Sequence, residues 1–252
     1  NASFEYAIQQ VVQAGDHVID IGAGTGLLSL LAVRHGAARA DAFECEESLA
    51  ETAVEVIARH GESRRIAVHQ QLSHDAELPP EERGDVLITE IFDCGLVGEG
   101  IVPSLRAARR TLLKPGYRAV PRRGDLRGAL LECPQARRLN QVDEACGIDI
   151  SPINVHSTRG QFPLRLTTWE HRLLSEAGQI WSIDLESEPS DAGTWLQAFT
   201  ATHDGVVDGV VAWFELEITD GVRLSTHPTE KTHWMQAFMC FDSPVPVRAG
   251  TT

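Results

Sequence analysis

The sequence lacks any hydrophobic run long enough to cross a membrane, and no charged-then-apolar leader opens it. The longest apolar stretch, LLSLLAV at residues 27–33, is far shorter than the roughly 18 residues that suggest a membrane-spanning helix. These absences argue against a membrane protein and predict a soluble chain. The first residue is asparagine rather than methionine, so we expect native residues to precede it.

Cysteine is also scarce and is poorly placed for structural chemistry. The five cysteines are odd in number and form no C-x-x-C pair, so neither a disulfide framework nor a zinc site is indicated. The ten histidines show no ligand spacing either, and we expect no metal. This pattern fits a reducing compartment, the cytoplasm or also the nucleus.

Positive charge is in deficit. Thirty-six acidic residues against 22 basic ones give a net charge of −14, which repels the backbone of nucleic acids and favours basic partners. With 252 residues, 42% of them hydrophobic, the chain can bury a sizeable core in one large domain or two modest ones. We expect a globular protein that does not bind nucleic acid directly.

The first half of the chain alternates strand and helix patterns. Short β-branched runs predict strands at residues 17–22, 40–45, 64–70 and 84–90, and amphipathic segments predict helices at 26–37, 48–61 and 103–113. Lys114, Pro115 and Gly116 are the expected stop of the last helix. This alternation predicts a parallel, doubly wound α/β sheet with right-handed crossovers.

After Pro121 the pattern changes to strand-like runs, at residues 127–133, 164–169, 179–185, 195–202, 209–219 and 233–241. Phe214, Leu216 and Ile218 alternate with Trp213 and two glutamates, as a half-buried antiparallel strand requires. We therefore predict two domains, residues 1–121 and 122–252, with a long insertion at about 140–161 in the second. Insertions of this length are usually functional or interacting.

The segment DIGAGTG, residues 20–26, lies between a predicted strand and a predicted helix. Gly22 and Gly24 let the backbone turn tightly and approach a ligand, and Glu44 ends the next strand, where it can accept hydrogen bonds from two ribose hydroxyls. A dinucleotide loop would need a glycine at position 27, which is Leu27. The spacing therefore favours a nucleoside ligand without a pyrophosphate, and a tight turn without a ligand is the alternative.

Three segments carry a family resemblance. VIDIGAGTGLLSL (18–30) with Glu44 resembles the S-adenosylmethionine site of class I methyltransferases. TEIFDCGLVGEG (89–100) resembles the double-glutamate loop of protein arginine N-methyltransferases, and THWMQAF (232–238) resembles their Thr-His-Trp loop. They occur in the order of that family, and the strand-rich second half matches its β-barrel domain.

The resemblance implies a Rossmann-like methyltransferase domain followed by a β-barrel domain whose insertion is a dimerisation arm. It implies a cofactor site in which a loop binds S-adenosylmethionine, a carboxylate holds the ribose and two residues border the adenine: Asp20, Gly22, Gly24, Glu44, Ser73 and His74. Glu90 and Glu99 would grip the substrate guanidinium, and His233 and Trp234 would close the same pocket. Asp93, between the two glutamates, receives no role.

Elementary chemistry supports the two-glutamate assignment. Arginine stays protonated, so its nitrogen lone pairs are delocalised and it is a poor nucleophile. Two carboxylates can localise the positive charge on the nitrogens that do not react and aim the remaining nitrogen at a methyl group. The expected reaction methylates arginine in basic or Arg-Gly-rich proteins and leaves S-adenosylhomocysteine. His233 would accept the released proton or hold a neighbouring acid in place, and a buried, hydrogen-bonded histidine is the alternative.

The amino-acid sequences of the second and third motifs most resemble those of the tandem-module branch of the family, which implies a type III, monomethylating enzyme. The position of the insertion implies a homodimer, or a tandem pseudo-dimer. Two other functions stay open: a catalytically inactive methyltransferase-like module that binds partners or supports a tandem neighbour, and a small-molecule methyltransferase. Paired glutamates and a β domain, which most neutral small substrates would not need, disfavour the latter.

Overall fold

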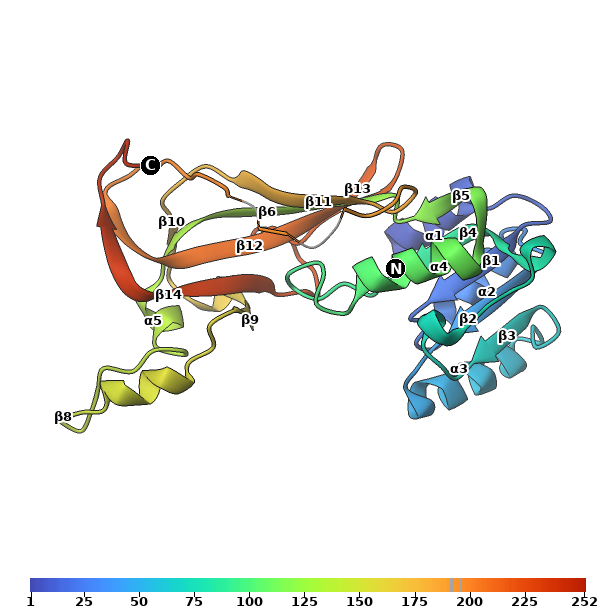
Figure 1. Cartoon of the computed structure of the whole chain (residues 1–252), viewed down its shortest axis with the longest axis horizontal. Coiled ribbons are helices and arrows are strands. Elements are labelled where there is room, and N and C mark those ends of the chain that lie inside the picture. The colour runs from blue at the N-terminus through green and yellow to red at the C-terminus, as the bar shows by residue number, and fades with distance from the viewer. Residues whose placement is uncertain (191–192, 195) are drawn as a thin grey trace.

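A computed structural model describes residues 1–190, 193–194 and 196–252. Figure 1 shows an α/β unit beside a long unit of antiparallel strands. The α/β unit contains sheet A, five parallel strands in the order β3-β2-β1-β4-β5. Their bounds are β1 His17–Ile21, β2 Arg39–Phe43, β3 Ile66–His69, β4 Gly84–Thr89 and β5 Leu113–Val120. This order confirms the predicted doubly wound parallel sheet.

Helices cover sheet A because each has an apolar stripe that must be buried. The helices are α1 Ala2–Val11, α2 Leu27–Arg34, α3 Glu47–Arg59 and α4 Ile101–Thr111, with the short 3₁₀ turns η1 Ser73–Asp75 and η2 Pro80–Glu82. In α3, for example, Ala50, Ala53 and Ile57 share one buried face. No helix in the described part of the chain is long and apolar enough to cross a membrane.

Sheet A ends in a strand that the sequence pattern did not predict. The expected helix stop at Lys114 to Gly116 lies inside β5, between Leu113 and Arg118, the positions that pair with β4. A proline and a glycine are tolerated there because β5 is an edge strand and its ladder is interrupted at these residues.

The second unit is built on sheet B, which is antiparallel throughout. Its strands are β6 Arg123–Glu132, β9 Gln161–Leu164, β10 Arg172–Leu173, β11 Gly178–Asp184, β12 Gly205–Thr219, β13 Val222–Ser225 and β14 Gln236–Val247. They pair in the order β10-β6-β12-β14-β9, with β11 on β6 and β13 on β12. The predicted fold class, a Rossmann-like domain followed by a domain of the β-barrel type, is confirmed, although no pairing among the described residues closes sheet B into a ring.

Three strand predictions in this half were wrong in part. At residues 164–169 the strand has already ended at Leu164, and a 3₁₀ turn, η4 Leu166–Thr168, follows. Residues 233–235 precede β14 instead of belonging to it. Of residues 195–202, Trp195 lies outside the described residues, residues 196–200 form no strand, and Ala201 makes an isolated bridge. Threonine and aromatic residues favour a pleated surface, but they do not supply a partner strand.

Strand β12 is buried on both faces along its middle, not on one face as predicted. Phe214 and Leu216 pack into a core that also contains the interior of the α/β unit. Trp213, expected on the solvated face, is 1% exposed and packs with Val211 and Phe238 in a second core inside sheet B. The first core therefore spans both units and joins sheet B to the α/β unit.

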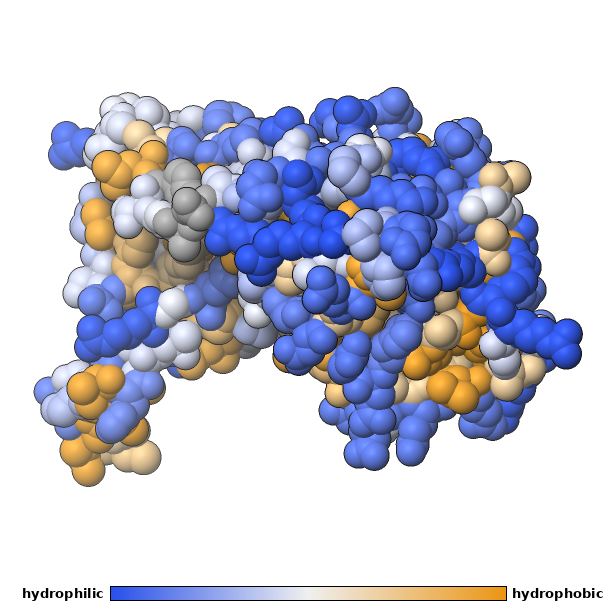
Figure 2. Space-filling model, turned by 45° about the vertical axis from the view of Figure 1, so that its right-hand side comes forward, coloured by the Kyte–Doolittle hydropathy of each residue, from blue (hydrophilic) through white to orange (hydrophobic). Residues whose placement is uncertain are grey.

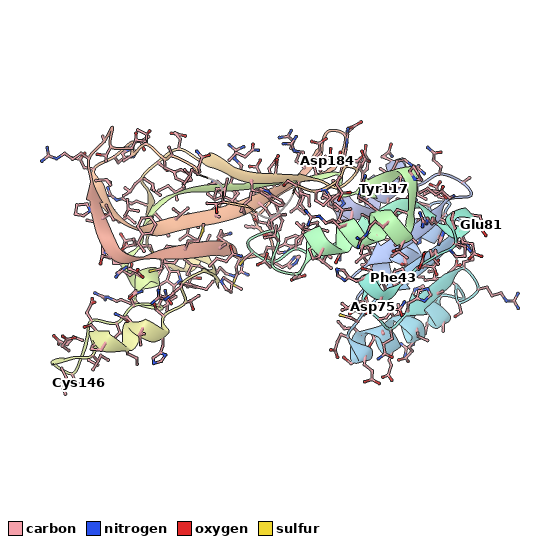
Figure 3. All side chains as sticks on the ribbon, viewed as in Figure 1. Phe43, Asp75, Glu81, Tyr117, Cys146 and Asp184 are labelled. Atoms are coloured by element: carbon pink, nitrogen blue, oxygen red, sulfur yellow. The ribbon has the colours of Figure 1, made fainter. Side chains whose placement is uncertain are left out.

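A polar contact adds to this junction. The hydroxyl of Tyr117 in β5 donates a hydrogen bond to the carbonyl of Leu185, next to Asp184 at the end of β11. Figure 3 labels Tyr117 and Asp184 on the two sides of the junction. Tyr117 in turn accepts a hydrogen bond from Arg109 at 3.0 Å.

An arm projects from sheet B. It contains α5 Pro134–Arg137, the hairpin β7 Glu144–Ala145 and β8 Ile148–Asp149, and the 3₁₀ segment η3 Ser151–His156. Figures 1 and 3 show it pointing away from both units, with Cys146 at its tip, and apolar residues gather on it in Figure 2. Leu139, Ile148, Ile153 and Val155 are each more than half exposed. The predicted insertion at 140–161 falls on this arm, while the two-domain division at residue 121 stays a prediction.

Candidate active site

The glycine loop after β1 combines tight backbone turns with a close approach to a second loop. Gly22 and Gly24 have φ of 74° and 54°, in the left-handed region that favours glycine. A Cβ on Gly22 would lie 2.3 Å from the Ile91 side chain, whereas one on Gly24 would meet nothing within 4 Å. Gly22 therefore lets the two loops pack together, and Gly24 leaves open space for a ligand.

Glu44 follows β2 and lies beside this loop, as predicted. Its carboxylate accepts the backbone N–H of Gly24 and that of Glu46, both at 2.9 Å, one on each oxygen. The side chain is buried, yet it lines a hollow between the glycine loop and the residues after β3. We call this the inner hollow. Each oxygen has a lone pair left, so Glu44 can accept two further donors, such as the hydroxyls of a ribose.

Asp20 lies beneath the glycine loop at the end of β1 and is fully buried. One carboxylate oxygen accepts the Ser29 hydroxyl at 2.7 Å, and the other has no partner among the described residues. Burial raises the pKa of Asp20 to about 6, although the Ser29 hydrogen bond opposes the shift. A buried acceptor without a donor, next to an open glycine cradle, fits the polar end of a bound S-adenosylmethionine.

The two residues predicted to border the adenine differ in placement. Ser73 is buried and lines the inner hollow, together with Phe43, Gln71 and Leu72. Phe43, labelled in Figure 3, stacks on a histidine of β3 with 4.8 Å between ring centroids. His74 is exposed and lines neither the inner hollow nor the two hollows described below. The adenine roles of Ser73 and His74 stay predictions.

Glu90 and Glu99 come together across the loop that joins β4 to α4. Both line the inner hollow and an adjoining outer hollow, which Asp93, Cys94, Pro163 and Met235 also line. Glu90 also lines a third hollow, between the glycine loop and α1. It therefore lies where the three hollows meet. We call Glu90 and Glu99 the clamp, and residues 91–100 the clamp loop.

The clamp carboxylates have no hydrogen-bond or ion-pair partner among the described residues. Burial, reinforced by the nearby charge of Glu99, raises the pKa of Glu90 to about 7. Burial and the charge of Asp93 also raise the pKa of Glu99. Two unpartnered acids whose charges repel each other are poised to receive a cation.

The Thr-His-Trp loop reaches the clamp from sheet B. The Trp234 indole donates a hydrogen bond to the carbonyl of Phe92 at 3.0 Å and packs edge-on against Phe214, with 5.4 Å between ring centroids. His233 lies against Trp234, with 3.8 Å between their centroids. It is exposed, and it lines the outer hollow together with Glu90. The alternative of a buried, hydrogen-bonded His233 is therefore wrong.

Two contributors to the site were not predicted. Phe92 is almost fully buried beneath Trp234, and Gln161 at the start of β9 donates to Asp93 at 3.0 Å. Phe92 lies inside the double-glutamate motif and Gln161 lies in no motif, but each acts through a contact that only the tertiary fold creates. In the described part of the chain, no group of three or more His, Cys, Asp or Glu side chains is arranged so that it could hold a metal ion.

Comparison with known proteins agrees with this geometry. The arginine methyltransferase oligomerization subdomain matches residues 131–252, and the ribosomal protein L11 methyltransferase family matches residues 5–98. An arginine N(omega)-methyltransferase of Streptomyces achromogenes subsp. streptozoticus is 43% identical over 256 residues, which cover 100% of this chain and 71% of that protein. The chain belongs to the arginine N-methyltransferase family. The predicted family, enzyme class and cofactor, S-adenosylmethionine, are thereby confirmed.

Two more distant comparisons also cover nearly the whole chain. Protein arginine N-methyltransferase 9 of Xenopus laevis is 32% identical over 273 residues, and the matched region covers 94% of this chain but 33% of that protein. The structure of a Trypanosoma brucei PRMT1 enzyme-prozyme heterotetrameric complex with AdoHcy superposes with a TM-score of 0.82 at 21% identity, covering 99% of this chain and 80% of that one. The chain therefore spans about a third of the length of the Xenopus relative.

Proposed function

We propose that this arginine methyltransferase adds a single methyl group to a guanidinium nitrogen of arginine in basic protein segments. The observation that carries the proposal is the clamp: Glu90 and Glu99 have no side-chain partner among the described residues, and both line the inner and the outer hollow. A guanidinium has five N–H donors and no acceptor, so two carboxylates match it in charge and in hydrogen bonding. The net charge of −14 favours basic segments as substrates.

Some residues of the site bind the cofactor, and others orient the substrate guanidinium. S-adenosylmethionine supplies an electrophilic sulfonium methyl when it is bound. Glu44 and the glycine loop hold the cofactor side of the site, while the clamp orients the guanidinium so that one nitrogen faces the inner hollow. Alignment within about 3–3.5 Å then contributes to the rate through proximity and orientation. The methylated guanidinium must release one proton, and His233 at the mouth can pass it to solvent.

The test is methyl transfer from labelled S-adenosylmethionine to an Arg-Gly-rich peptide, its lysine-substituted twin and free arginine. We expect label in the arginine peptide alone, and a mass increase of one methyl group per modified arginine. Equal labelling of both peptides would contradict the guanidinium clamp. Label in free arginine but not in the peptide would contradict a protein substrate. No label in any of the three would favour the inactive module.

We also propose that the chain forms a homodimer, or a tandem pseudo-dimer, through the arm, in a reducing compartment such as the cytoplasm. Leu139, Ile148, Ile153 and Val155 expose apolar surface on a projection, which a monomer would leave in water. The match to an oligomerization subdomain over residues 131–252 supports this assignment. Light scattering should give twice the mass of one chain, and aspartate in place of Ile148 and Val155 should reduce it to one. A single-chain mass for the unmodified protein would contradict the dimer.

A further inference from the structure

Sheet B holds the clamp loop at two neighbouring residues. Trp234 donates to the main-chain carbonyl of Phe92, and the Gln161 side-chain amide donates to one carboxylate oxygen of Asp93, both at 3.0 Å. Gln161 opens β9, Trp234 precedes β14, and these two strands pair with each other. The loop that carries Glu99 is therefore attached to one rigid edge of the other unit.

Asp93 connects the contact with sheet B to the backbone next to Glu99. Its second carboxylate oxygen accepts the backbone N–H of Gly98, the residue before Glu99, at 2.8 Å. Its main-chain carbonyl accepts the N–H of Leu96 at 3.0 Å. Asp93 thus closes the clamp loop on itself and fixes the backbone from which Glu99 extends. Glu99 has no partner of its own among the described residues, so its position depends on that backbone.

The clamp loop is shaped around the contact between Asp93 and Gln161. A Cβ on Gly95 would lie 1.9 to 2.4 Å from atoms of the Gln161 amide group, and a Cβ on Gly98 would lie 2.3 Å from the carboxylate oxygen of Asp93 that receives this amide. The backbone φ of neither glycine lies in the left-handed region. A Cβ at either position would therefore push one member of this pair of side chains out of the contact that it makes with the other.

We propose that Asp93 and Gln161 are positioning residues for arginine methyl transfer, and that the hydrogen bond between them holds Glu99 opposite Glu90. The inference rests on the proposed function of the clamp. An ordinary loop cap would need the Asp93 bond to Gly98 alone, whereas positioning also needs the bond from Gln161. Because a misplacement of about 1 Å can lower a rate by about 10²-fold, this single contact can govern turnover.

The test exchanges the amide and the carboxylate between the two positions. Gln161→Glu alone sets two carboxylates against each other, and we expect kcat to fall about 10²-fold with S-adenosylhomocysteine affinity within about twofold of the original. Adding Asp93→Asn lets the new amide keep its oxygen on the Gly98 N–H and donate its nitrogen to the new carboxylate. The double variant should regain kcat to within about fivefold. Gln179→Glu, an exposed change of equal charge in β11, is the matched control.

Hydrogen exchange of the Gly98 amide tests the pair without any substrate. We expect faster exchange in Gln161→Glu than in the unmodified chain, and slower exchange again in the double variant. If the unmodified chain methylated no arginine, the proposed function would fail while this measurement still reported on the pair. A kcat within twofold in Gln161→Glu, a double variant no better than the single one, or unchanged Gly98 exchange would each overturn the positioning role.

Discussion

Replacing Glu99 with glutamine is expected to lower kcat for arginine methylation on the order of 10²- to 10³-fold while leaving the affinity for S-adenosylhomocysteine nearly unchanged. Glutamine keeps the size of the side chain but removes its charge and presents an amide N–H₂ to a guanidinium that has only donors. Glu99 is exposed in this structure, and a bound guanidinium would cover it. Losing one carboxylate from a covered, hydrogen-bonded charge pair costs about 2–5 kcal/mol, or roughly 30- to 5,000-fold in rate, a span that includes the expected fall.

The cofactor should be spared because other residues bind it. Glu44 and the glycine loop hydrogen-bond to each other and to the residues around the end of β2, and not to Glu99. Calorimetry with S-adenosylhomocysteine and single-turnover kinetics on an arginine peptide separate the two effects. Glu55→Gln, which removes the same charge from an exposed position on α3, is the control. A cofactor affinity that collapsed together with turnover would show that the role given to Glu99 is wrong.

The site motifs could be predicted because each is local. The glycines and Glu44 follow consecutive strands of a parallel sheet, and the carboxyl ends of such strands meet at one edge. Glu90 follows β4 at that same edge, so its approach to Glu44 and Gly22 follows from the strand order. The alternation of strands and helices in the sequence therefore predicts the side of the site that the carboxyl edge of sheet A forms.

The remaining parts depend on contacts that no local pattern encodes. Trp213 stands in an alternating strand pattern that predicts exposure, but the interior of sheet B buries it, because that strand separates two cores. Asp93 and Gln161 are 68 residues apart, and each is an ordinary polar residue in its own segment. Strand β5 was missed because a proline and a glycine interrupt its ladder at a sheet edge. In each case the deciding partner lies far along the chain.

The efficiency kcat/KM for arginine should rise about tenfold per pH unit up to about pH 7 and then level off. The pKa of Glu90 is raised to about 7 by burial and by the charge of Glu99, so below this pH Glu90 is largely protonated and the clamp lacks one of the two charges that hold a guanidinium. Arginine itself does not titrate in this range, so the rise in kcat/KM reports the titration of a group on the enzyme. Assays between pH 5 and 9 should show this rise in kcat/KM, both in the unmodified chain and in the control Glu55→Gln. A flat profile would contradict an ionised Glu90 as the binding form.

The raised pKa of Glu90 also predicts that its ionised carboxylate lowers the free energy of unfolding at neutral and alkaline pH. Because the folded pKa of Glu90 exceeds its unfolded value, the native state binds more protons between these values, and stability falls as pH rises through that window. Glu90→Gln removes the desolvated charge, so at pH 8 it should raise the melting temperature while abolishing turnover. At pH 4, where both forms are neutral, the melting temperatures should converge. A lower melting temperature for Glu90→Gln at pH 8 would mean that Glu90 has a stabilising partner and is not reserved for the substrate.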